Sequence, residues 1–273
     1  MSEPTAVPEF SVAEVHEAIA ATRPDELCLV FRDRRLTWAD VTDRTRRLAN
    51  HLIGRGLGCH TERQHLQGHE SGQDHLAIYL HNGNEYLECM LGSFKARVAP
   101  FNVNYRYGPD EVHYLFDNAD AEAVVFHGAF ADLIDKVRGR LPLVKRFYMV
   151  PDVENAVVPS WAVNYNDIVS APKPDVTPAK PLSGDDLLFL YTGGTTGMPK
   201  GVMWRQEDLF AVLGYGANAL FGVGPAESVE ALIDRVTPEW PNLKAYVACP
   251  LMHGTGLFSS FIGLRSEEHT SEL

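Results

Sequence analysis

Tyr191-Thr-Gly-Gly-Thr-Thr-Gly-Met-Pro-Lys-Gly201 is the stretch of this sequence that indicates the fold and the kind of site most strongly. It follows the apolar run Leu187-Leu-Phe-Leu190, which predicts a buried strand. Glycines let a backbone turn sharply and approach a ligand closely, and successive N–H groups in such a turn can point at one anion. The candidate binding residues are Thr192, Gly193, Gly194, Thr195, Thr196, Gly197 and Lys200. The pattern predicts a polyphosphate-binding loop; the alternative is a glycine-rich turn between a strand and a helix that binds nothing.

Composition and charge narrow the classes of protein. The chain has 273 residues, 45% of them hydrophobic, which is enough for a globular core. A formal net charge of -12 argues against a basic surface for nucleic acid, so we expect no nucleic-acid partner. The four cysteines are scattered without a CxxC pair, which favours reduced thiols and a cytoplasmic protein. The polar start Met1-Ser-Glu-Pro4 lacks a signal-peptide core, and no apolar run is long enough to cross a bilayer, although peripheral membrane contact stays open.

Helix and strand patterns alternate along the first part of the chain. The expected helices span residues 11–22, 37–56, 84–95, 109–118 and 130–138. The expected strands span residues 27–31, 76–80, 98–103, 123–126, 146–150 and 187–190. This alternation predicts an α/β fold with parallel sheets flanked by helices. Ligands in such sheets bind at the carboxyl ends of strands, which is where the loop after Leu190 lies.

Residues 151–185 differ from the segments around them because they are rich in proline and polar residues. We interpret them as a surface connection with one short helix near Tyr165–Val169. We expect this connection to separate an N-terminal α/β subdomain, residues 1–150, from the start of a second subdomain, residues 186–264. The second subdomain would carry the phosphate-binding loop.

Residues 59–75, which we name the inserted loop, contain four histidines. On a helix, His65 and His69 would share one face and could bind a metal ion. Gly68 and Gly72 oppose a helix in this segment, so we favour a solvated loop before the strand at Leu76. We therefore assign no metal ligands to it.

The stretch Tyr191–Gly201 resembles the phosphate-binding signature of adenylate-forming enzymes, which include acyl-CoA synthetases, luciferases and the adenylation domains of peptide synthetases. With Val202-Met203-Trp204 after it, the stretch is most similar to that of bacterial fatty-acyl-CoA ligases. Other segments resemble further family motifs in the family's order: Leu36–Val41 with Arg47–Ala49, Phe94–Asn104 and Ala248–Gly254. The resemblance runs from about Ala13 to Leu264 and implies the N-terminal part of the adenylate-forming fold. The inserted loop is longer than the usual link of the family.

The resemblance also implies a reaction. A carboxylate attacks the α-phosphate of ATP to give an acyl–AMP anhydride and pyrophosphate, and coenzyme A then takes the acyl group as a thioester. The loop from Thr192 to Lys200, together with Mg²⁺, would neutralise the leaving pyrophosphate. His253 would lie beside the carboxylate as the candidate catalytic residue. The acid is expected to be a fatty acid or a steroid side-chain acid, with aryl acids as an alternative.

For two of these side chains, an interpretation without a functional role stays open. Lys200 could be a solvated lysine of the loop, and His253 could be a packed or solvated histidine beside the glycine-rich turn Gly254-Thr-Gly256. A binding module that holds nucleotide or acyl chain without turnover is the alternative to an enzyme.

The C-terminal end of the chain has two further features. The last nine residues, Arg265–Leu273, match one reading frame of a common sequencing-library adapter, so we interpret them as a non-native tail; the alternative is a natural polar helix end. The family's later motifs, among them the small C-terminal domain with its lysine, have no counterpart before Leu264. We therefore expect an N-terminal fragment of an acyl-CoA ligase that is inactive by itself.

Overall fold

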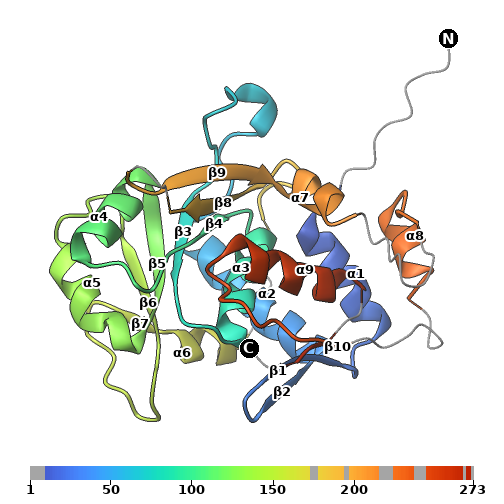
Figure 1. Cartoon of the computed structure of the whole chain (residues 1–273), viewed down its shortest axis with the longest axis horizontal. Coiled ribbons are helices and arrows are strands. Elements are labelled where there is room, and N and C mark those ends of the chain that lie inside the picture. The colour runs from blue at the N-terminus through green and yellow to red at the C-terminus, as the bar shows by residue number, and fades with distance from the viewer. Residues whose placement is uncertain are drawn as a thin grey trace.

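The structure is a computed structural model that describes residues 10–172, 178–193, 197–214, 224–236, 244–266 and 269–271. Its largest feature is a seven-stranded sheet in the order β7-β6-β5-β3-β4-β8-β9 (Figure 1). The strands are β3 (His75–Tyr79), β4 (Ala99–Asn102), β5 (Ala121–His127), β6 (Arg146–Val150), β7 (Val163–Asn164), β8 (Leu187–Thr192) and β9 (Lys200–Arg205). Neighbouring strands are parallel except β8 and β9, which are antiparallel. The predicted α/β class with a parallel sheet is confirmed.

The central strand β3 shows why this sheet is buried on both faces. A parallel sheet covered by helices on both sides needs nearly continuous apolar strands rather than alternating ones. The run His75-Leu-Ala-Ile-Tyr79 is buried along its whole length. Leu76 and Ile78 join the core on one face, whereas Ala77 and Tyr79 join the core on the other.

Helices form a layer on each face of the large sheet. On one face lie α4 (Pro109–Asn118) and α5 (Ala131–Arg138), which contribute Val112, Leu115, Ile134 and Val137 to one core cluster. The other cluster includes residues of α1 (Val12–Thr22), α2 (Trp38–Gly54), α3 (Asn84–Lys95), α6 (Tyr165–Ser170), α7 (Gln206–Val212), α8 (Val229–Ile233) and α9 (Gly254–Ser266). Figure 1 shows α4 and α5 to the left of the sheet and α9 crossing in front of α3. Helices α3 and α4 begin and end at the residues that the sequence predicts.

The N-termini of α2 and α1 show that a capping residue in the sequence forms the expected hydrogen bonds at one helix and not at the other. At α2, Thr37 Oγ1 accepts a hydrogen bond from Asp40 N (3.1 Å), and Asp40 Oδ2 accepts one from Thr37 N (2.9 Å), which is a complete capping box. At α1, Ser11 holds the N-cap position, but its side chain makes no cap hydrogen bond. Its hydroxyl donates instead to Gln206 Oε1 (3.3 Å), because α7 packs beside the start of α1.

A second sheet of four strands has the order β10-β11-β1-β2. The strands are β1 (Leu27–Phe31), β2 (Arg34–Thr37), β10 (Lys244–Ala245) and β11 (His269–Ser271). β1 and β2 form an antiparallel hairpin, and β2 was not predicted. β10 ends at Ala245, and residues 246–248 belong to no regular element. β11 lies in the segment that we interpreted as a non-native tail; its pairing with β1 and β10 does not bear on the origin of that segment, which stays a prediction.

The proline-rich connection returns the chain to the same large sheet. Its described part contains β7 and the predicted short helix α6, and β8 then pairs with β4 through Phe101 and Phe189. We expected the connection to divide one sheet from the strand that carries the loop. The structure differs, because the apolar run Leu187–Tyr191 extends the first sheet instead of starting another. The division into subdomains stays a prediction.

The inserted loop, residues 59–75, projects above β9 in Figure 1. It contains a short 3-10 helix, η1 (Arg63–His65), and turns, so the predicted loop is confirmed and His65 and His69 share no α-helical face. Arg97 fastens its base by donating two 2.9 Å hydrogen bonds to Glu62 and two more, of 2.8 and 2.7 Å, to Asp186. In the part of the chain that the structure describes, no three His, Cys, Asp or Glu side chains are grouped closely enough to hold a metal ion. Within the same residues, no helix is both long and apolar enough to span a bilayer.

Candidate functional site

The loop predicted to bind phosphate connects β8 to β9. These two strands form an antiparallel hairpin in which Tyr191 pairs with Gly201 and Thr192 pairs with Lys200. A strand therefore follows the loop, not the helix that the alternative interpretation assumed. The loop leaves the sheet at the carboxyl end of β8, the edge at which ligands bind in parallel sheets.

The described candidate residues of this loop all face solvent: Thr192, Gly193, Gly197 and Lys200. Gly194, Thr195 and Thr196 lie outside the described residues. Lys200 was placed in the loop by the sequence analysis, and the structure corrects this placement, because Lys200 is the first residue of β9. The run Val202-Met203-Trp204 explains the difference, since it pairs with Leu188–Leu190 of β8 and draws Lys200 into the strand.

Asn102 at the end of β4 joins the loop to a distant turn of the chain. Its side chain is 3% exposed. Its Oδ1 accepts a hydrogen bond from Tyr191 N (2.7 Å), and its Nδ2 donates to Tyr191 O (3.0 Å) and to Met252 O (2.5 Å). One amide group therefore holds the residue before Thr192 and the residue before His253. The two predicted sites, far apart in sequence, are brought together at this point.

A second amide fixes the turn from Cys249 to Met252. Asn82, which follows β3, accepts a hydrogen bond from Leu251 N through Oδ1 (2.9 Å) and donates through Nδ2 to Cys249 O (3.4 Å). Asn82 lies shortly after β3 and Asn102 at the end of the neighbouring parallel strand β4, so both amides lie at the same edge of the sheet. This edge positions the backbone on either side of the candidate site.

His253 lies at the beginning of α9 and is exposed. Its carbonyl accepts from Leu257 N (3.0 Å), and its own N–H donates to Pro250 O (3.0 Å). The two glycines after His253 let this helix start against β8. A Cβ at Gly254 would lie 2.8 Å from Leu190 Cδ2, and one at Gly256 would lie 2.4 Å from Pro250 O. The N-terminus of α9, which carries partial positive charge, is thereby held next to β8.

Tyr191 and α4 support the hairpin from the side. The phenol of Tyr191 donates to Asn118 Oδ1 (2.9 Å), and its ring covers Gly201, where a Cβ would come within 2.8 Å of ring atoms. Burial raises the pKa of Tyr191 to about 12, so its hydroxyl keeps its proton. Tyr114 of α4 donates to Pro199 O (3.4 Å) at the exit of the loop. Both ends of the loop are therefore held while its described residues stay open to solvent.

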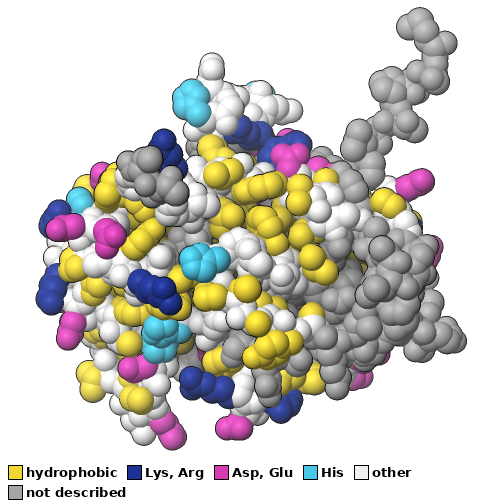
Figure 2. Space-filling model, viewed as in Figure 1, with side chains coloured by type: hydrophobic (Ala, Val, Ile, Leu, Met, Phe, Trp, Pro, Cys, Tyr) yellow, Lys and Arg dark blue, Asp and Glu magenta, His cyan; other side chains and the backbone are white. Residues whose placement is uncertain are grey.

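The arrangement suits an anionic ligand bound at the carboxyl edge of the sheet. Thr192 supplies a hydroxyl, the glycines supply approachable N–H groups, and Lys200 supplies a cation beside Thr192. On the face shown in Figure 2, apolar side chains gather over the hairpin and α9, whereas most charged side chains lie toward the rim. Such a surface can bind a ligand whose charged group lies at the loop and whose apolar part packs beside it.

Sequence reasoning found the loop and His253 but missed the two asparagines that position them. It named neither Asn82 nor Asn102 as a site residue. The available signal was a polar amide at the end of a buried strand or shortly after it, a place where parallel sheets put ligand-binding residues. Asn82 and Asn102 share that signal, but neither sequence position reveals that the partners are backbone groups of residues 191 and 249–252.

Comparison with known proteins identifies the class. The family model of AMP-binding enzymes matches residues 16–266, so the chain belongs to the AMP-binding enzyme family. The predicted resemblance to adenylate-forming enzymes is confirmed. The fold agrees: the N-terminal domain of FACL13 from Mycobacterium tuberculosis superposes with a TM-score of 0.72 at 18% identity, covering 96% of this chain and 57% of that one.

Two relatives are acyl-CoA ligases by name. The medium-chain acyl-CoA ligase Mig of Mycobacterium avium is 42% identical over 250 residues, which are 92% of this chain and 45% of the relative. The 3-oxocholest-4-en-26-oate–CoA ligase of Rhodococcus rhodochrous is 34% identical over 258 residues, 94% of this chain and 44% of the relative. The chain therefore spans just under half the length of these curated relatives.

Proposed function

We propose that this chain supplies the phosphate-binding loop and part of the acyl site of an ATP-dependent acyl-CoA ligase. In the proposed reaction a carboxylate oxygen attacks the α-phosphate of ATP, the bond to pyrophosphate breaks, and an acyl–AMP anhydride forms. The sulfur of coenzyme A then attacks the acyl carbon and AMP leaves. The observation that carries the proposal is Asn102, which ties the loop strand and the His253 turn to one point.

The chain's own residues would act by binding and orienting. Thr192, Gly193, Gly197 and Lys200 would hold the leaving pyrophosphate, together with Gly194, Thr195 and Thr196 outside the described residues. Donors fixed in advance stabilise charge that develops in the transition state, because they need not reorganise during the reaction. His253 would donate a hydrogen bond to the acyl oxygen beside the start of α9.

The donor set of the loop fits Mg²⁺ that arrives with ATP. Mg²⁺ keeps several waters and is held by few protein carboxylates together with substrate phosphates. The described loop residues offer hydroxyl and backbone groups rather than a carboxylate cage, which suits an ion carried mainly by the phosphates. When bound, the ion neutralises charge on the departing pyrophosphate.

The acid that we propose is a fatty acid or the side-chain acid of a steroid. This assignment is supported by the names of the two relatives, one acting on medium-chain acyl groups and the other on 3-oxocholest-4-en-26-oate. The apolar surface over the hairpin and α9 is compatible with either (Figure 2).

Exchange of labelled pyrophosphate into ATP tests the first step directly. We expect a protein extended along the genomic reading frame beyond Leu264 to catalyse exchange that depends on added carboxylate. We expect the 273-residue chain to show little exchange, since it spans 45% of the Mig ligase. Strong exchange by the short chain would show that the further residues are not needed. No exchange by the extended protein with fatty, steroid or aryl acids would favour a binding module without turnover.

Replacing Lys200 with alanine in the extended protein should lower kcat/KM for ATP about tenfold. A tenfold loss corresponds to about 1.4 kcal/mol, close to the lower end of the roughly 1.5–3 kcal/mol that a hydrogen bond to a charged group contributes. Lys200→Arg should recover part of the rate, because it keeps the charge. Lys136→Ala on α5 is the matched control and should leave the rate unchanged. An undiminished rate in Lys200→Ala would make Lys200 a solvated lysine without a role.

A further inference from the structure

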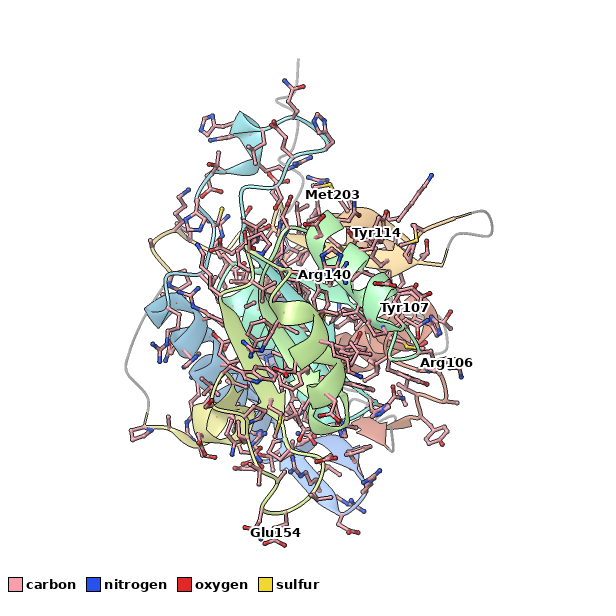
Figure 3. All side chains as sticks on the ribbon, turned by 90° about the vertical axis from the view of Figure 1, so that its left-hand side faces the viewer. Arg106, Tyr107, Tyr114, Arg140, Glu154 and Met203 are labelled. Atoms are coloured by element: carbon pink, nitrogen blue, oxygen red, sulfur yellow. The ribbon has the colours of Figure 1, made fainter. Side chains whose placement is uncertain are left out.

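A cavity of about 520 Å³ lies between the inserted loop and the β8–β9 hairpin. Its size is typical of sites for small molecules. Phe189 and Tyr191 of β8, Met203 of β9 and Leu66 of the inserted loop form apolar walls. Figure 3 shows Met203 at the end of the molecule that faces the inserted loop. Side chains of the hairpin strands line the cavity, whereas the proposed phosphate site uses the loop between those strands.

The charged side chains around this cavity are acidic. Glu70 and Asp120 both line it, as does His69, and no lysine or arginine is among its described lining residues. His75 also lines it, and its two ring nitrogens are already engaged: Nδ1 donates to Ala119 O (2.6 Å), so Nε2 accepts from the Ser71 hydroxyl (2.8 Å). Burial lowers the pKa of His75, which leaves the ring neutral at pH 7. The lining therefore combines aromatic rings with carboxylates.

The inserted loop forms the outer wall of the cavity, and hydrogen bonds within the loop hold this wall in place. Arg63 donates to the carbonyls of Gly68 (2.7 Å) and Glu70, which closes the turn between them. Glu70 Oε2 accepts from Gln67 N (2.8 Å). These contacts, with the clamp of Arg97 at the base of the inserted loop, fix the wall without closing the cavity.

We propose that this cavity binds a small organic cation, an alkylammonium or arylalkylammonium ion. Its ammonium group would face the carboxylates of Glu70 and Asp120, and its apolar body would pack against Tyr191, Phe189 and Met203. Cations are attracted to aromatic faces as well as to carboxylates, and the apolar walls add burial of the body. An anionic ligand would meet two carboxylates and, among the described lining residues, no lysine or arginine. A bare metal ion would leave the apolar walls without a partner.

Binding of three probes of similar shape separates charge from apolar contact. The probes are phenethylammonium, the neutral 2-phenylethanol and the anionic phenylacetate, each titrated into the chain by calorimetry and by ring-proton NMR. We expect saturable binding of the ammonium, at least fivefold weaker binding of the alcohol, and none of the carboxylate. Equal binding of ammonium and alcohol, stronger binding of phenylacetate, or no saturable binding of the ammonium would overturn the proposal.

Two double variants test whether the cation binds in this cavity. The double variant Glu70→Gln/Asp120→Asn should weaken binding of phenethylammonium about fourfold or more, since exposed charge pairs contribute roughly twofold to fivefold each. The control Asp135→Asn/Glu154→Gln removes two exposed carboxylates elsewhere, Glu154 lying at the opposite end of the molecule in Figure 3. This control should bind as the parent does. Unchanged binding by the first double variant, or an equal loss in the control, would refute the assignment.

A filling variant tests the apolar walls. Met203→Trp should abolish binding by occupying the cavity, with folding verified by circular dichroism. Retained binding in a folded Met203→Trp chain would place the cation elsewhere. Because the first double variant changes only exposed side chains, the proposal can still be refuted if the tryptophan variant fails to fold.

Discussion

Replacing Asn102 with alanine should lower carboxylate-dependent pyrophosphate exchange at least a hundredfold and destabilise the chain by about 3 kcal/mol. Asn102 is buried and makes three hydrogen bonds to backbone groups of Tyr191 and Met252. Alanine would leave these backbone groups without that partner, and each buried polar group that loses its partner costs roughly 1–3 kcal/mol. The rate should fall because the loop strand and the His253 turn would no longer be held to one point. A displacement of about 1 Å can cost a hundredfold in rate.

Two comparisons make the Asn102 result interpretable. Asn104→Ala is the matched control, since the Asn104 side chain accepts from Arg106 N (2.9 Å) within the same segment, and its loss should change stability by less than about 1 kcal/mol. Asn102→Asp keeps the acceptor for Tyr191 N but loses the donor to both carbonyls. It should therefore resemble alanine rather than the parent. Exchange would be measured in the extended protein and unfolding in urea. Undiminished exchange with Asn102→Ala would show that the rate does not depend on the link that Asn102 makes between the loop strand and the His253 turn.

Local signals in the sequence were enough for helices α1 to α6 and for the parallel strands β3, β4, β5, β6 and β8, whereas α7, α8, α9 and β7 were not predicted. The capping pair Thr37 and Asp40 is complete within four residues, and α3 and α4 have the predicted bounds. These features depend on neighbours along the chain. β2 and β9 were missed because antiparallel pairing with β1 and β8 decides them, and Arg34-Arg-Leu-Thr37 has little apolar character of its own. The return of β8 to the first sheet depends on its pairing with β4, which lies far from it in the sequence.

The same distinction explains what was predicted of the candidate site. The glycines and threonines after Leu190 are a continuous motif, so the loop could be located without the structure. Asn82 and Asn102 act through carbonyl and N–H groups of residues 191 and 249–252, and no local pattern encodes such partners. The cavity is likewise formed by the inserted loop with β8, β9 and the end of α4. The roles of the loop residues and of His253 stay predictions.

Replacing Glu88, whose carboxylate is buried, should cause the largest loss of stability that we predict. Glu88 on α3 is fully buried and accepts hydrogen bonds from Arg44 Nε (2.7 Å) and Nη2 (2.9 Å) of α2. It also accepts from the Tyr165 hydroxyl (2.9 Å) of α6 and from Asn84 Nδ2 (2.7 Å). Burial by itself would lower the pKa of Arg44, but the carboxylate of Glu88 raises it above its ordinary value. This group fastens three helices on the face of the sheet opposite α4 and α5.

Glu88→Leu should lower the free energy of unfolding by about 3–5 kcal/mol, because it leaves buried donors of Arg44 and Tyr165 without their acceptor. The midpoint of urea unfolding measures this loss. The double variant Arg44→Met/Glu88→Leu should be less destabilised than Glu88→Leu, since replacing both charges by apolar groups removes the unpaired charge. Asp135→Ala is the control: its pair with Arg138 is exposed and should contribute less than about 1 kcal/mol. A loss below 1 kcal/mol in Glu88→Leu, or a double variant worse than the single one, would contradict this account. The first outcome would mean that apolar packing of α3 against α2 holds the helices, and the second that Arg44 has partners of its own.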